Sequence, residues 1–76
     1  MKLFVKIRAL RKEAGKTQSR AAQDAGIQTA AWTCFETGSL RYRNPQLKTI
    51  QAIAKGLGCS VPFLLDGVDP VEGDER

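Results

Sequence analysis

Reactive side chains are scarce in this sequence. It has no histidine among its 76 residues, so Cys34 and Cys59 lack the partner that activates a nucleophilic thiol or completes a common zinc site. It also shows no close carboxylate pair, no glycine-rich phosphate loop and no cluster of metal ligands. We therefore expect reduced cysteines, no metal or other cofactor, and a protein that is not an enzyme.

The charged side chains favour a polyanionic partner. Residues 1–65 contain eleven of the twelve Lys and Arg residues but only three of the eight Asp and Glu residues. The other five acidic residues follow from position 66, so a basic body precedes an acidic end. A basic surface attracts nucleic acid most often and anionic membranes next. Solvated charges that serve only solubility are the alternative interpretation.

The spacing of apolar residues predicts five short helices and no strand, which is an all-α fold. Glycines at positions 15, 26, 38 and 58 are expected to end four of these helices. Thr17 and Ser60 are typical N-cap residues for the second and fifth, and Pro45 is suited to the start of the fourth. The helices are expected at about residues 3–14, 18–25, 29–37, 45–57 and 61–65.

The last residues of the sequence include few apolar side chains that a core could bury. From Val68 onward the sequence is polar and acidic, so we expect a single domain at residues 1–67 and a flexible acidic tail at residues 68–76. The stretch Met1–Lys12 is too highly charged for a signal peptide, and no segment approaches membrane-spanning length. These features predict a cytoplasmic protein without a membrane partner.

The second and third predicted helices have an arrangement of their own. Two helices of about eight residues joined by a turn at Gly26 are too closely connected to form an antiparallel hairpin, so they should cross at a steep angle. The second helix of the pair then stands out from the body. The residues expected to pack across this pair are Ala21, Ala22, Ala25, Ile27, Trp32 and Phe35.

The segment QSRAAQDAGIQTAAWTCFETG, with its motif at about residues 18–37, resembles the helix-turn-helix of the lambda-repressor/Cro-like (XRE) transcription regulators. The later segment NPQLKTIQAIAKGLGCSVPFLLDG is similar to the fourth and fifth helices of that family. The resemblance implies a five-helix lambda-repressor-like domain that binds double-stranded DNA sequence-specifically, with the helix at about 29–37 in the major groove. It implies a small transcriptional regulator of the repressor kind, usually a homodimer.

The same resemblance assigns roles to individual residues. Five residues are expected to face base edges: Gln28, Thr29, Ala30, Thr33 and Cys34. Gln18 matches the family residue that hydrogen-bonds a phosphate. By position, further phosphate contacts are expected from Arg8, Arg41, Tyr42, Arg43, Asn44 and Lys48. For each of these basic residues, a solvated charge is the alternative.

Arg11 and Glu36 match a pair that the family uses as a salt bridge between the first helix and the end of the third. The sequence also departs from the family pattern. Ala21 stands where the family favours Leu, and Trp32 stands where it favours Ile or Val, which we interpret as an exchange of volume between facing residues. The loop between Glu36 and Pro45 is about three residues longer than usual, which leaves its phosphate contacts open.

The fifth helix is too short to bury all of its apolar residues. We expect Val61, Leu64 and Leu65 to form the homodimer interface, and Phe63 to belong to the core of the monomer.

Two other binding functions compete with this reading. An antitoxin-like or partner-binding module on the same fold would use the acidic tail to engage a second protein. RNA binding would need exposed stacking aromatics or a recognisable RNA-binding module, and neither is visible.

Overall fold

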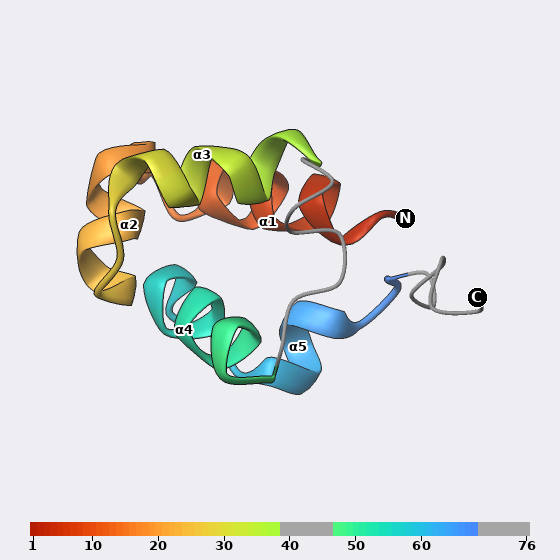
Figure 1. Ribbon diagram of the computed structural model, residues 1–76. Helices are drawn as coiled ribbons and strands as arrows, with labels where there is room; N and C mark the ends of the chain where they lie inside the picture. Colours follow the sequence, from red (N-terminus) through yellow and green to blue (C-terminus); the bar gives the residue numbers. More distant parts are fainter. Residues whose placement is uncertain (39–46, 69–76) are drawn as a thin grey trace, which may run out of the picture.

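The computed structural model describes residues 1–38 and 47–68. These two segments contain five α-helices and no strand, as the sequence predicts: α1 (Leu3–Glu13), α2 (Gln18–Ala25), α3 (Thr29–Thr37), α4 (Leu47–Leu57) and α5 (Val61–Leu65). Figure 1 shows α1 and α3 together on one side of the molecule and α4 and α5 on the other, with α2 across one end. None of these helices is long and apolar enough to cross a membrane.

The helix ends follow the expected local signals. The Thr17 hydroxyl accepts a hydrogen bond from the backbone N–H of Arg20, and the Ser60 hydroxyl accepts one from the N–H of Phe63. Gly26 ends α2 with φ of 76°, a left-handed conformation in which a side chain would be strained. Pro45, the predicted start of the fourth helix, lies outside the described residues.

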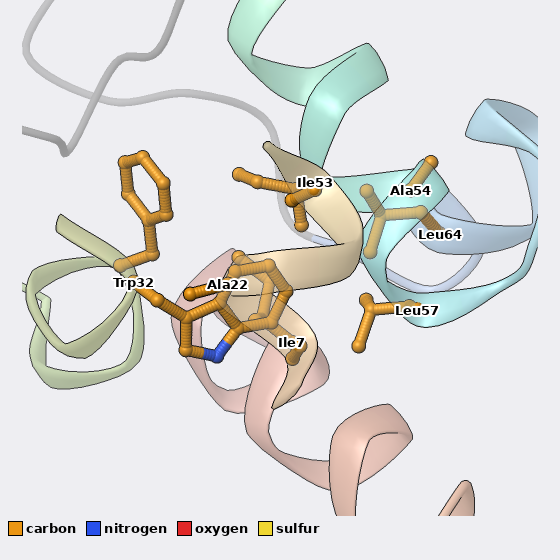
Figure 2. Packing of buried hydrophobic residues seen from close by; sticks show 10 residues of the cluster. Ile7, Ala22, Trp32, Ile53, Ala54, Leu57 and Leu64 are labelled. Carbon is orange, nitrogen blue, oxygen red and sulfur yellow. The ribbon is translucent and has the colours of Figure 1, made fainter. Parts of the chain in front are cut away.

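A small apolar core holds the helices together. Its buried members come from all five helices: Ile7, Ala21, Ala22, Ala25, Trp32, Phe35, Ile53, Ala54, Leu57 and Leu64. Figure 2 shows the Trp32 side chain projecting from α3 into this cluster. Trp32 is fully buried and is the largest of these side chains, so its volume determines how closely the neighbouring helices can approach.

Small residues surround Trp32. Gly56 lies inside α4, and a Cβ atom at this position would stand 2.6 Å from the Ala21 carbonyl oxygen and 3.1 Å from Trp32 Cζ3. Helix α4 therefore packs on α2 at a distance that only glycine permits. The fully buried Ala21 is part of the same tight region. Gly56 was not among the residues expected to pack in this region, although it lies against both Ala21 and Trp32.

The orientation of α5 differs from the sequence prediction. Leu64 is fully buried in the monomer, whereas Phe63 is 54% exposed, so the roles expected for these two residues were wrong. Val61, one turn before Leu64, is half-buried and packs on the same core, while Leu65 is exposed. The Ser60 cap sets the phase of α5, and a helix of five residues is too short for its apolar pattern to reveal that phase.

Candidate nucleic-acid interface

The α2–α3 pair is joined by a three-residue connection from Gly26 to Gln28. The N–H of Ile27 donates to the carbonyl oxygen of Ala22 at 3.0 Å, which closes the end of α2. The axis of α2 runs across that of α3 instead of alongside it (Figure 1). This crossing leaves the start of α3 at the surface, as the steep packing inferred from the short connection requires.

The first residues of α3 and its N-cap are open to solvent. Gln28, Thr29 and Ala30 are exposed, while Thr33 and Cys34 are half-buried. Gln28 is the N-cap residue, but its side chain makes no cap hydrogen bond, so its amide remains available to a ligand. The five residues expected to read bases thus include three on an open surface and two that are partly covered.

A buried carboxylate lies behind this surface. Glu36 is 1% exposed and accepts a bidentate pair of hydrogen bonds from Arg11, with Nε on Oε2 at 2.5 Å and Nη2 on Oε1 at 3.1 Å. The Trp32 indole N–H donates to Oε2. Arg11 also donates to the carbonyl oxygen of Lys16 at 2.8 Å. Arg11 thereby links α1, the α1–α2 connection and α3 through charge-assisted hydrogen bonds.

These contacts decide the charge state of Glu36. Burial on its own would raise the pKa of this carboxyl, but the hydrogen bonds from Arg11, Trp32 and Gln18 outweigh that penalty and hold its pKa below the ordinary value of 4.5. Glu36 is therefore ionised at neutral pH, and its charge is balanced by Arg11.

Gln18, at the first position of α2, connects the buried carboxylate with the surface. Its Nε2 donates to Glu36 Oε1 at 3.2 Å, and its Oε1 accepts from the Thr33 hydroxyl at 3.1 Å. One hydrogen of the Gln18 amide has no partner among the described residues, so it could still meet a phosphate. The expected phosphate contact would have to be made by this second N–H.

The two contacts of Gln18 were not expected from the sequence, and neither were two other polar contacts in this region. The Ser19 and Thr29 hydroxyls lie 3.4 Å apart, which brings the start of α2 beside the start of α3. The Trp32–Glu36 hydrogen bond was also missed, because Trp32 was considered only as a core residue. Its spacing of four residues from a carboxylate on the same helix is the signal that could have revealed it.

The basic residues differ in their availability. Arg8 and Lys48 are exposed, as a phosphate contact requires. Arg20 and Lys16 are instead paired with Asp24, whose pKa is lowered by the hydrogen bond from Lys16 and by Arg20. The other four predicted phosphate contacts lie outside the described residues: Arg41, Tyr42, Arg43 and Asn44.

The two cysteines are not joined by a disulfide, and one of them, Cys34, is among the five residues expected to face bases. Cys34 and Cys59 are free thiols, and burial raises the pKa of Cys59. No group of three or more potential metal ligands occurs within residues 1–38 and 47–68.

Comparison with solved structures finds several similar proteins. The chain is similar to a mutant of the restriction-modification controller protein C.Esp1396I, with 28% identity, a TM-score of 0.74, and coverage of 84% of this chain and 79% of that chain. It is also similar to the DNA-binding domain of the P22 c2 repressor, with 27% identity, a TM-score of 0.76, and coverage of 88% and 84%.

A second P22 c2 repressor structure is a complex with synthetic operator 9T, and it shares 27% identity with this chain at a TM-score of 0.71, covering 88% of this chain and 97% of that one. A search of curated proteins finds no match. Residues 5–64 match the family described as a helix-turn-helix domain. Five helices, the crossed α2–α3 pair and this match over most of the sequence show that the chain belongs to the helix-turn-helix domain family of lambda-repressor-like regulators.

Proposed function

We propose that this protein is a sequence-specific DNA-binding regulator of the repressor type, with α3 in the major groove of double-stranded DNA. The observation that carries the proposal is the open start of α3, where Gln28, Thr29 and Ala30 are exposed at the end of a crossed helix pair. The similarity to a repressor that has been solved in complex with a synthetic operator supports DNA binding by this fold. Amide, hydroxyl and methyl groups are the chemical types that read base edges.

The proposed contacts divide into two groups. Gln28, Thr29, Ala30, Thr33 and Cys34 face the bases, and the second N–H of Gln18 meets a phosphate at the positive end of α2. Arg8 and Lys48, together with the residues of the 41–44 segment, neutralise further phosphates.

Selection of duplexes from a randomised library, followed by titration at several salt concentrations, tests the proposal. Specific binding should weaken with salt by roughly 0.9 log unit of affinity per log unit of salt for each phosphate neutralised. Arg8→Ala and Lys48→Ala should each flatten that slope without changing the selected sequence. Ala30→Glu should abolish binding, because it places a carboxylate at the groove surface. Lack of any preference among duplexes would refute the proposal.

We also propose a two-fold homodimer, because one short recognition helix with few long polar side chains contacts too few base pairs to specify an operator. Two recognition helices would then reach half-sites about 34 Å apart. Phe63 and Leu65 are the large apolar side chains of α5 that are exposed, at 54% and 38%. They replace the buried Leu64 as the proposed interface, with Val61 at its edge.

The division into a domain at residues 1–67 and an acidic tail remains a prediction, since residues 69–76 lie outside the described part of the chain. A protein partner for that tail has no supporting observation in the structure.

A further inference from the structure

A chain of hydrogen bonds leads from the protein interior to the surface of α3. It begins at Arg11, passes through Glu36 to Gln18, and ends at Thr33. Glu36 is 1% exposed, whereas Thr33 is half-buried at the edge of the proposed DNA-binding surface. The two ends of this series of hydrogen bonds therefore lie in different environments. The assignment of donor and acceptor in one hydrogen bond restricts the assignment in the next.

The carboxylate of Glu36 fixes the orientation of the Gln18 amide. An ionised carboxylate can only accept hydrogen bonds, so the amide group within 3.2 Å of Glu36 Oε1 must be the nitrogen. The opposite orientation would place the amide oxygen against a carboxylate oxygen. Oxygen and nitrogen of an amide are similar in shape, so this electrostatic requirement is what selects between the two orientations.

The fixed amide oxygen is one of two acceptors that face the Thr33 hydroxyl. The Thr33 hydroxyl lies 3.1 Å from Gln18 Oε1 and 3.1 Å from the carbonyl oxygen of Thr29, and both of these atoms are acceptors. A hydroxyl has one hydrogen, and either partner occupies it. The oxygen lone pairs are all that remains for an external ligand.

We propose that Thr33 meets DNA as a hydrogen-bond acceptor only, because its single hydrogen is directed to Gln18 Oε1 or to the Thr29 carbonyl oxygen. In the major groove the matching donors are the exocyclic amino groups, adenine N6 and cytosine N4. The acceptor groups, guanine O6 and thymine O4, are disfavoured at the same position. Thr33 is thus a specificity determinant; this inference rests on the proposed DNA-binding function.

The test begins with duplexes selected from a randomised library by the wild-type protein. Each base pair of the selected site is varied in turn, and the dissociation constants are compared for wild type, Thr33→Val and Thr33→Ser. Val removes the hydroxyl at nearly constant shape, while Ser retains it. The position contacted by Thr33 is the one whose base preference changes in Thr33→Val and persists in Thr33→Ser. At that position the wild type should prefer adenine or cytosine by roughly two- to tenfold, the range of a single hydrogen bond.

A base analogue provides a second test of the hydrogen bond from the exocyclic amino group to Thr33. Replacing the preferred base with an analogue that lacks the exocyclic amino group should weaken wild-type binding by the same factor and leave Thr33→Val binding unchanged. Preservation of every base preference in Thr33→Val, or a wild-type preference for guanine or thymine at this position, would overturn the inference while leaving DNA binding intact. Failure of the wild type to select any duplex would instead overturn the proposed function.

Discussion

Trp32 and Glu36 lie one turn apart on α3, and the indole N–H of Trp32 donates to the buried Glu36 carboxylate. Trp32 is the largest side chain of the core. Its polar partner, Glu36, is the only buried charged residue within residues 1–38 and 47–68. Trp32 and Arg11 therefore bind the same carboxylate, which connects the apolar core with the salt bridge. The consequences for stability, pH response and packing can be measured separately.

Trp32→Phe should destabilise the domain. The substitution leaves an aromatic ring but removes the donor to a charged acceptor, a hydrogen bond whose loss costs roughly 1.5 to 3 kcal/mol in addition to the lost volume. Urea unfolding followed by circular dichroism measures the total. The same substitution made in a Glu36→Gln background separates the cost of the lost hydrogen bond from the cost of the lost volume, since the charged partner is then absent. Equal costs in both backgrounds would show that only volume matters.

Stability should fall when Glu36 is protonated. The pKa of Glu36 is lower in the folded protein than its ordinary value of 4.5, so the folded state binds the proton less readily than the unfolded chain. Its contribution is complete above the unfolded pKa and is lost as the pH drops through the folded pKa. The unfolding temperature of the wild type should decline from about pH 5 downward.

Glu36→Gln should show a shallower decline over the same pH range. Asp24 has a lowered pKa as well, because of its hydrogen bonds with Lys16 and Arg20, and it titrates in the same direction. Asp24→Asn is therefore the matched control that removes the second contribution. Parallel pH profiles for wild type and Glu36→Gln would contradict the assignment to Glu36.

The features that sequence analysis could predict are those encoded locally. Gly26 and Gly38 end their helices in left-handed conformations, and Thr17 caps α2, because each signal depends on a few neighbouring residues. The crossed helix pair followed from the short connection between two short helices. These local rules were enough to predict five helices and a projecting α3, whereas the lambda-repressor-like fold and the base-facing residues were implied by the family resemblance.

The remaining features depend on contacts between distant segments. Leu64 and Phe63 exchange their expected roles because α5 is too short to show a periodic pattern. Gln18 is held by Glu36 and Thr33, and no spacing within one helix reveals an amide shared between two helices. Gly56 lies in the segment that resembles the fourth helix of the family, but its need for close contact with α2 is visible only in three dimensions.

Gly56→Ala should destabilise the fold even though alanine favours helices. The added Cβ atom would lie 2.6 Å from the Ala21 carbonyl oxygen and 2.8 Å from the Ala25 Cβ atom, so α4 must move away from α2. Overpacking of this kind costs roughly 1 to 3 kcal/mol, which exceeds the gain in helix propensity of about 1 kcal/mol. In an Ala25→Gly background one of these contacts is absent, so Gly56→Ala should cost less there than in the wild type. A Gly56→Ala variant as stable as the wild type would disprove the close approach.

The last prediction concerns the exposed face of α5. Phe63 is 54% exposed, and the ammonium group of Lys6 lies 5.5 Å from its ring centroid, so the ring is partly covered by α1 but retains open area. If this face forms the proposed two-fold interface, Phe63→Lys should shift the protein to monomer in sedimentation and weaken operator binding, because two half-sites are then no longer bound together. Its unfolding temperature should remain close to that of the wild type, since the side chain lies outside the core. Leu64→Lys is the contrasting variant: Leu64 is fully buried, so this change should unfold the monomer. A Phe63→Lys protein that sediments like the wild type and protects the same length of operator would place the interface elsewhere.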